Sequence, residues 1–366
     1  MYAWTIANSS RLAFAPSSHA ETGAALFVTS FGRLPHREEA VGETYAVGTH
    51  GHETHRPNEF GIISALTQRF SSVDNVVVGP GDDSAVVMAP DRRVVACTDV
   101  LVEGRHFRRD WSSASDVGHR AAAANMADIA AMGASPTALL LGLAAPRETP
   151  LTWLQELADG IEAEARMTAA AVVGGDTVSS PTLTISITAL GDLRGGEAVR
   201  RSGAQAGDLV AYAGRLGWAA AGYTILSRGF RSPGSLVSAH RRPIVSYSAG
   251  LAAPALGATA MIDVSDGLLA DVGHLGQESG VAIDIDSTRL SVPDAMRNAG
   301  KAMGVEPMQW VLTGGEDHAL VATFPRDAQL TGDWHVIGHV RAGTGVTVDG
   351  RPYGDGPVGW DHFRSS

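Results

Sequence analysis

The chain has 366 residues and a mass of 38.0 kDa, enough for about two ordinary domains, and 44% hydrophobic residues can supply their cores. Its net charge of −11 argues against nucleic-acid binding, and its single cysteine, Cys97, excludes an intrachain disulfide and a multi-cysteine metal site. No apolar run approaches the roughly 20 residues of a membrane helix, and no secretory signal opens the chain, so we expect a cytoplasmic protein without a membrane partner.

The first segment in chain order, residues 1–56, has a composition typical of low order. It mixes Ser, Ala, Gly, His and Thr without sustained periodicity, so we expect an extension rather than part of a core. Its HGHETH stretch imitates a metal site, but His52 and His55 are three residues apart, whereas a zincin helix places its histidines four apart. The spacing therefore argues against a metal site there.

The folded part is expected to begin with a short helix. Asn58 can cap it, and Phe60, Ile63 and Leu66 would share one face. Two strand-like runs, SAVVM and RVVACT, follow it.

Two longer helices come next. We expect the first over 116–132, capped by Ser115 and ended by Gly133, and the second over about 152–170. The second leads into the strand AAVV, the turn GGDT and the run TLTISITAL, whose alternation predicts a half-exposed strand.

A second unit is expected from residue 198 onward. It has a strand over 209–213, a helix after Gly217, the strand–turn–helix pattern AMIDVSDGLLADVGHL, and the segment VLTGGEDHALVATF. The pattern predicts an N-terminal α/β domain over 57–197 and a C-terminal α/β domain over 198–366. GGED in the second echoes GGDT in the first, which weakly supports the division.

Acidic residues repeatedly follow apolar runs, at the strand ends where sites are built. Any one of them could be an ordinary cap or turn residue. The helix over 116–132 adds Asn125 and Asp128, which are three apart and share a face. The acids at the ends of apolar runs are Asp83, Asp99, Asp176, Asp263 and Asp266.

Taken together, these acids predict a magnesium site. Converging carboxylates repel one another unless cations neutralise them, and a set of oxygen ligands favours Mg²⁺, which also binds phosphate. Two common phosphate motifs are excluded: the one lysine, Lys301, lies outside a P-loop pattern, and GPGDDS has Ser84 where a dinucleotide fingerprint needs glycine. We therefore interpret the acids as a metal cage for a polyphosphate.

The same residues resemble a known family. The stretches GPGDDSAVV, CTDVLVEGRHF, NMADIAAMGASP, VVGGDTV, RSGAQAGD, IDVSDGLLADVGHL, TGGEDHAL and GWDHF occur in the order of the thiamine-monophosphate kinases, between about residues 59 and 363. That family belongs to the superfamily of aminoimidazole ribonucleotide synthetase. The resemblance implies a two-domain α/β (α+β) fold of the aminoimidazole ribonucleotide synthetase type, whose N-terminal sheet joins that of a partner in a homodimer.

The resemblance also implies the reaction, a direct Mg²⁺-assisted transfer of the γ-phosphoryl group of ATP to thiamine monophosphate, without a dedicated catalytic base. The implied metal ligands are Asp83, Cys97, Thr98, Asp99, Asp128, Asp176, Asp263 and Asp266. The implied ATP contacts are Gly174, Gly175, Asp176, Arg201 and Ser265, with Arg200 an alternative to its neighbour. The implied contacts with thiamine monophosphate are His106, Glu316 and Trp360.

Two departures and two alternatives remain open. His318 stands where the family commonly has tyrosine, and Trp360 where it often has tyrosine or phenylalanine. An aminoimidazole ribonucleotide synthetase-like enzyme is the nearest enzymatic alternative, disfavoured by GGEDHAL and GWDHF. A regulator that binds Mg-nucleotide without catalysis is the alternative from another class, and ATP turnover would distinguish it.

Overall fold

The computed structural model describes residues 58–81, 84–354 and 359. The expected extension over residues 1–56, Asp83 and Trp360 lie outside these ranges. No helix within them is both long enough and apolar enough to cross a membrane.

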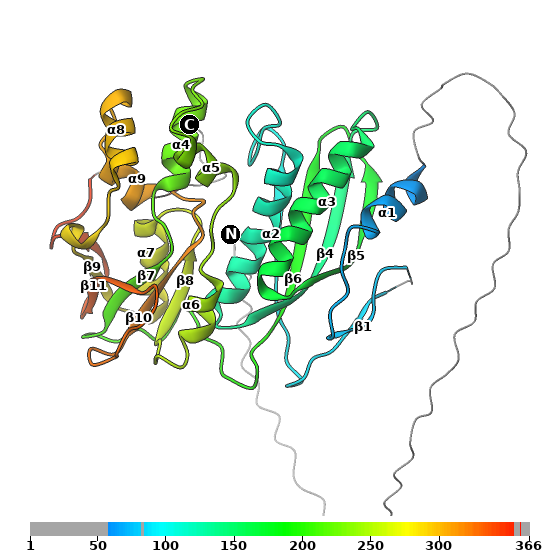
Figure 1. Cartoon of the computed structure of the whole chain (residues 1–366). Coiled ribbons are helices and arrows are strands. Elements are labelled where there is room, and N and C mark those ends of the chain that lie inside the picture. Colours follow the sequence, from blue (N-terminus) through cyan, green and yellow to red (C-terminus); the bar gives the residue numbers. More distant parts are fainter. Residues whose placement is uncertain (1–57, 82–83, 355–358, 360–366) are drawn as a thin grey trace, which may run out of the picture. The chain divides into compact units, whose positions relative to one another are not determined.

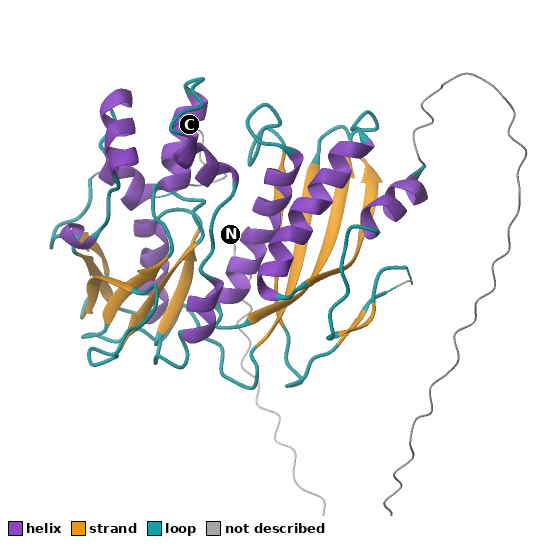
Figure 2. Cartoon of the chain, in the orientation of Figure 1, coloured by secondary structure: helices purple, strands orange, loops and turns teal. Residues whose placement is uncertain are grey.

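A four-stranded sheet organises the first part of the molecule (Figure 1). Its strands run in the order β3-β6-β4-β5, with β4 and β5 parallel and the other pairs antiparallel. Helices α2 and α3 pack against each other and on the same face of the sheet (Figure 2). The elements are α1 (Glu59–Thr67), β1 (Val76–Val78), β2 (Val86–Val87), β3 (Val95–Val102), α2 (Ala114–Ala131), β4 (Ser135–Ala145), α3 (Leu151–Ala165), the 3-10 turn η1 (Arg166–Thr168), β5 (Ala171–Ser179) and β6 (Thr184–Asp192).

Several local expectations for this part are confirmed. Asn58 caps α1, where its side chain accepts a hydrogen bond from the Gly61 N–H at 2.9 Å. Strand β6 alternates between buried and half-buried residues along its whole length.

Two local expectations were wrong. The cap of α2 is Ser113 rather than Ser115. The Ser113 hydroxyl accepts a hydrogen bond from the Asp116 N–H, and the Asp116 carboxylate accepts one from the Ser113 N–H, which closes a capping box. The stretch GGDT is not a turn. It continues β5, because these residues pair with β4.

A six-stranded sheet organises the second part, in the order β12-β9-β11-β7-β10-β8. The strand expected over 209–213 and the helix expected after Gly217 are both present, as β7 and α4. The elements are β7 (Leu209–Ala213), α4 (Trp218–Ser227), α5 (Gly234–Arg241), α6 (Tyr247–Ala252), β8 (Ala260–Val264), α7 (Leu268–Ser279), β9 (Ala282–Ile285), η2 (Ser287–Arg289), α8 (Asp294–Met303), α9 (Pro307–Thr313), β10 (Ala319–Phe324), β11 (His335–Arg341) and β12 (Gly345–Val348).

Helix α2 connects the two sheets. It contacts β3 and β6 of the first sheet and β8 and β10 of the second. One continuous buried cluster accordingly contains Ala127 and Ile129 of α2 together with Met261 and Leu320 of the second sheet. The domain boundary at 197/198 lies between β6 and β7 and stays a prediction.

Small residues allow α2 and α3 to approach closely. A Cβ atom on Gly118 would lie 2.1 Å from the carbonyl oxygen of Leu157, and one on Gly160 would lie 2.2 Å from that of Ser115. Both contacts are with backbone atoms, so a side chain at either position would have to push the helices apart.

We expect Gly118→Ala to lower the free energy of unfolding by about 1 to 3 kcal/mol, because the helices must separate to admit the methyl group. Gly234→Ala is the matched control: it lies at the start of α5, and a Cβ there meets no atom within 4 Å. Urea denaturation of both variants measures the difference. Equal losses of stability would contradict the close helix contact.

Candidate active site

Three aspartates from separate elements converge where α2 meets β3 and β8. Asp99 lies on β3, Asp128 on α2 and Asp263 on β8. They are close enough that the charge of Asp263 raises the pKa of both Asp99 and Asp128. Asn125 joins β3 to α2: its side-chain oxygen accepts a hydrogen bond from the Asp99 N–H at 2.9 Å, and its carbonyl accepts one from Cys97 Sγ at 3.1 Å. The helix face predicted from the spacing of Asn125 and Asp128 therefore lies against the middle of β3 rather than the end of a strand.

The convergence is electrostatically unfavourable without a cation. Burial, followed by the negative charges of Asp263 and Asp99, raises the pKa of Asp128 to about 8. Burial also raises the pKa of Asp99, whereas His318 acts in the opposite direction. At neutral pH Asp128 therefore retains its proton, because a neutral carboxyl avoids the free-energy cost of another buried negative charge beside Asp99 and Asp263.

His318 supplies a positive charge within the group. Its Nδ1 lies 3.1 Å from Asp263 Oδ2, and both side chains are buried. Burial alone would lower the pKa of His318, but the hydrogen bond and the charge of Asp263 outweigh it and raise this pKa to about 9. The imidazole is thus protonated at neutral pH and compensates one carboxylate.

The turn that carries His318 has an uncommon backbone conformation. Glu316 and His318 have φ angles of 69° and 51°, in the left-handed region that side-chain-bearing residues rarely adopt. The Glu316 N–H donates to the Ser265 carbonyl at 2.8 Å, and a Cβ on Gly315 would lie 2.1 Å from that same oxygen. The turn after α9 is therefore pressed against the end of β8.

Asp317 anchors the same turn to α4. Its buried carboxylate accepts a hydrogen bond from the Ala219 N–H at 2.8 Å, at the first turn of that helix. The sequence did not identify Asp317, because its partner Ala219 lies 98 residues away and no local pattern marks the pair.

Glu316 is held by a residue that the sequence also missed. Arg120 of α2 is buried, and its guanidinium forms an ion pair with the Glu316 carboxylate and donates to the His240 carbonyl at 3.3 Å. Arg120 is the one arginine of α2, a helix dominated by small residues. An arginine among small residues could have marked Arg120 as a special position. The sequence gives no indication that its partner is Glu316, 196 residues away.

Asp266 begins a second acidic region at the first turn of α7. Its backbone N–H and that of Gly267 both donate to the carboxylate of Asp271, at 3.1 and 3.0 Å. Burial, then repulsion from Asp263 and Asp266, raises the pKa of Asp271 to about 8. Asp271, which the sequence did not single out, therefore fixes the loop that carries Asp266 and Ser265.

Some expected residues lie away from this cluster. Asp99 of β3 and Gly175 of β5 lie in the same row across the sheet, because Asp99 pairs with Ile187 of β6, which pairs with Leu141 of β4, which pairs with Gly175. Three strand spacings separate them, a distance of about 14 Å. Asp176 follows Gly175, and Gly174 precedes it, on this far edge strand. The glycines expected to contact ATP and the aspartate cluster thus form two separate groups.

Arg201 also lies away from the cluster. Its carbonyl accepts a hydrogen bond from Ser279, the last residue of α7, whereas Asp266 precedes the first. A helix of this length spans about 18 Å. Arg200 is bound through its carbonyl to the Met261 N–H, near the start of β8 rather than its acidic end.

Thr98 lies within β3 and His106 follows that strand, and each is hydrogen-bonded to the backbone. The Thr98 hydroxyl donates to the Ile187 carbonyl at 3.0 Å, on the sheet face opposite Asp99, so only its backbone could serve the cluster. His106 follows β3, and its Nδ1 accepts a hydrogen bond from the Val102 N–H at 3.0 Å.

The residues present are compatible with Mg²⁺. Within residues 58–81, 84–354 and 359, no three His, Cys, Asp or Glu side chains are arranged to hold a metal ion. The donor set is nevertheless rich in carboxylates, the hard ligands that Mg²⁺ prefers, and a cation would relieve the repulsion that raises the pKa of Asp128.

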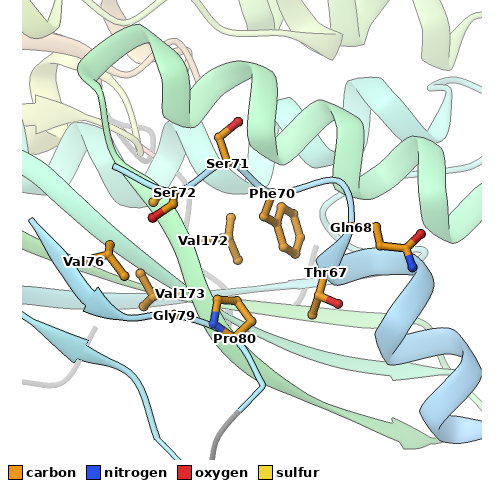
Figure 3. Close-up of a pocket in the computed structure, with 11 residues that line it drawn as sticks. Thr67, Gln68, Phe70, Ser71, Ser72, Val76, Gly79, Pro80, Val172 and Val173 are labelled. Carbon is orange, nitrogen blue, oxygen red and sulfur yellow. The ribbon is translucent and has the colours of Figure 1, made fainter. Parts of the chain in front are cut away.

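A cavity of about 230 Å³ lies elsewhere, at the start of β5 (Figure 3). Phe70, Val172 and Pro80 give it apolar walls, and Thr67 and Gln68 add polar groups. It adjoins the Gly-Pro-Gly turn on one side, and on the other the strand that leads to Gly174 and Gly175.

Comparisons with known proteins agree with these features. Residues 81–193 match the model of the AIR synthase related protein, N-terminal domain. A thiamine-monophosphate kinase of Mycobacterium tuberculosis is 47% identical over 307 residues, covering 83% of this chain and 91% of that protein. The thiamine-monophosphate kinase of Salmonella typhimurium is 35% identical, covering 84% of this chain and 98% of that protein.

Solved structures show the same relationship. The thiamine-monophosphate kinase of Stenotrophomonas maltophilia has a TM-score of 0.70 at 34% identity, covering 79% of this chain and 95% of that one. AaThiL complexed with AMPPCP and TMP has a TM-score of 0.70 at 33% identity, covering 83% and 97%. The hydrogenase maturation protein HypE of E. coli, 21% identical with a TM-score of 0.64, shares the fold. On the strength of the identities to its kinase relatives and of their coverage, the chain belongs to the thiamine-monophosphate kinase family.

Proposed function

We propose that this protein transfers the γ-phosphoryl group of ATP directly to the phosphate of thiamine monophosphate, giving thiamine diphosphate and ADP. The observation that carries the proposal is its 47% identity, over 83% of its length, to a thiamine-monophosphate kinase. The converging aspartates of β3, α2 and β8 are the chemical feature that such a transfer needs.

The chemistry requires charge neutralisation more than proton transfer. Donor and acceptor are both anions, and the acceptor oxygen is already ionised at neutral pH, so no dedicated base is required. When bound, Mg²⁺ would supply neutralisation and in-line positioning. We propose that Asp99, Asp128 and Asp263 hold it, together with Asp83 and Asp266, and that Cys97 and Thr98 assist through their backbone.

The two substrates would approach the aspartates from different sides, because a direct transfer brings both reacting phosphates to the metal. For ATP we propose the edge of β5 at Gly174, Gly175 and Asp176, and the cavity at the start of this strand suits the base. Ser265, which follows β8, and Arg201, beside the end of α7, stay predictions for the ATP side. For thiamine monophosphate we propose the region of His106 and Glu316, together with Trp360. Glu316 supports this assignment, because Arg120 fixes it beside the aspartates that would bind the reacting phosphates.

A homodimer is also part of the proposal. Val100 of β3 and Leu140 of β4 are 45% and 37% exposed on the sheet face opposite α2 and α3, where burial against a second copy would stabilise them. We further propose that the enzyme works in the cytoplasm. Sedimentation of the full chain beside Leu140→Lys would test the dimer, since a buried lysine there should dissociate it.

The decisive experiment is a product assay on the purified full chain. ATP, Mg²⁺ and thiamine monophosphate should yield thiamine diphosphate, whereas other phosphate acceptors should not react. ATP consumption only with the substrate of aminoimidazole ribonucleotide synthetase would favour the alternative enzyme. Nucleotide binding without any turnover would favour a regulator.

We expect Asp128→Asn to reduce turnover at least about 100-fold, since losing even an outer-shell partner of a metal costs about 10- to 100-fold. The fold should be preserved, because Asn resembles the protonated carboxyl that Asp128 carries at neutral pH. Asp159→Asn is the control, an exposed carboxylate on α3 that pairs with Arg69. Steady-state rates and melting temperatures measure both effects, and normal turnover in Asp128→Asn would remove this residue from the site.

We also expect the affinity for Mg²⁺ to rise about tenfold per pH unit as pH approaches 8, and to level off above it. The reason is that Asp128, whose pKa is about 8, must lose its proton when a cation binds. Calorimetry in buffers of different ionisation enthalpy should detect proton release at pH 7 and little at pH 9. An affinity independent of pH between about 6 and 8 would contradict this assignment.

A further inference from the structure

Arg120 is a buried cation that joins three elements. It lies on α2, its side chain is 5% exposed, and its guanidinium contacts both α5 and the turn over 314–318. Helix α5 lies beside α2 (Figure 1). Neither partner of Arg120 belongs to its own helix. A buried charge is unfavourable unless it is paired, so these two contacts are what keeps Arg120 in this place.

The first contact fixes the guanidinium to the end of α5. Nη1 of Arg120 donates to the carbonyl of His240 at 3.3 Å. His240 lies in the last turn of α5, where backbone carbonyls lack partners within the helix and carry the negative end of its dipole. Because the guanidinium is planar and rigid, this contact also limits the direction in which its remaining N–H groups point.

The second contact orients Glu316. Nη2 of Arg120 forms the ion pair with Oε2 of Glu316. The Glu316 side chain is 40% exposed, so the pair buries its cation and leaves its carboxylate accessible. Within residues 58–81, 84–354 and 359, Oε1 of Glu316 accepts no hydrogen bond. This second oxygen can therefore accept one from a ligand.

The backbone and the neighbouring charges restrict Glu316 further. Its N–H donates to the Ser265 carbonyl at 2.8 Å, and its φ angle of 69° lies in the left-handed region. Burial raises the pKa of Asp99, and the charges of Asp263 and Glu316 raise it further, so Glu316 lies within electrostatic reach of the aspartate cluster. Without Arg120, this repulsion would turn the Glu316 side chain toward solvent.

We propose that Arg120 is a positioning residue for the acceptor substrate: its guanidinium holds Oε2 of Glu316 so that Oε1 faces the acceptor and accepts a hydrogen bond from it. This inference rests on the proposed function and adds a residue that acts through Glu316. The part of the acceptor recognised in this way carries a hydrogen-bond donor, as the aminopyrimidine of thiamine monophosphate does, because an ionised carboxylate only accepts.

A purely structural role for Arg120 predicts a different pattern. If Arg120 only joins α2 to α5, its removal should lower stability and weaken ATP and acceptor alike. If it acts through Glu316, its removal should weaken the acceptor alone. It should then have little further effect once Glu316 itself has been replaced.

Arg120→Met is the informative variant, because it removes the charge and keeps an unbranched apolar side chain in the buried place. Glu316→Gln and the double variant complete a double-mutant cycle. Arg242→Gln is the matched control. Arg242, just beyond the end of α5, also joins α5 to α2, but through an ion pair with Asp116 rather than with Glu316.

The full chain is titrated by calorimetry with thiamine monophosphate, and the KM for ATP and the melting temperature are measured on the same preparations. In Arg120→Met we expect roughly tenfold weaker binding of thiamine monophosphate, the scale of a lost hydrogen bond to a charged group, with the KM for ATP nearly unchanged. In the Glu316→Gln background the same substitution should weaken binding by less than about twofold. Arg242→Gln should bind thiamine monophosphate as the wild type does.

Arg120→Lys is the second variant. It keeps a charge for Glu316 but lacks the fork that also reaches the His240 carbonyl, so we expect a smaller loss of acceptor affinity and again no change in the KM for ATP. It carries the test if Arg120→Met does not fold. Acceptor affinity equal to that of the wild type, or a matching loss for ATP, would then overturn the proposal.

The outcomes separate the two levels of the proposal. Wild-type protein that makes no thiamine diphosphate would overturn the proposed function and this inference with it. Active wild-type protein whose Arg120→Met variant binds thiamine monophosphate normally would overturn the positioning role alone. Equal weakening toward acceptor and ATP, or an undiminished effect in the Glu316→Gln background, would assign Arg120 to the packing of α2 against α5.

Discussion

Repulsion among three carboxylates is the constraint on which the candidate site depends. Asp99, Asp128 and Asp263 come from a strand of each sheet and from the helix that packs against both. Without compensating groups they would separate or remain protonated, and their mutual repulsion contributes to the raised pKa of Asp128. The surrounding structure resists it through the pairing of His318 with Asp263 and through the Asn125 bridge from α2 to β3.

The packing of α2 fixes the positions of the site residues on this helix. Its small side chains leave the helix buried on most sides, so it can contact α3, β3 and β8 together. Close packing of this kind moves as a unit, because interior atoms have little free volume. A change at Gly118 should therefore be felt at Asp128 as well as in overall stability. The charge-bearing residues Arg120 and Asp128 are positioned by the alanines around them.

The sequence predicted local features well and spatial relations less well. The Asn58 cap and the alternation of β6 follow from rules that act over a few residues, and the family and fold type suggested by the motifs are confirmed. The expectation of acids at strand ends was wrong for Asp99 and Asp176, which lie inside β3 and β5. Ser113 rather than Ser115 caps α2 because the Asp116 carboxylate accepts a hydrogen bond from the Ser113 N–H. Pairing with β4 overrode the turn propensity of GGDT. The distance of Asp176 from Asp99 follows from strand order, which periodicity does not encode.

The turn over 314–318 uses an uncommon backbone conformation to orient two side chains of the site. Two left-handed residues, Glu316 and His318, are separated by Asp317, whose carboxylate is fixed by the first turn of α4. With alternate residues held in this conformation, Glu316 is directed to Arg120 and His318 to Asp263. One side of the turn thus faces Arg120 and the other faces the acids proposed to bind the metal. Any movement of α4 on substrate binding would reach both through Asp317, which couples recognition of the acceptor to the charge balance of the cluster.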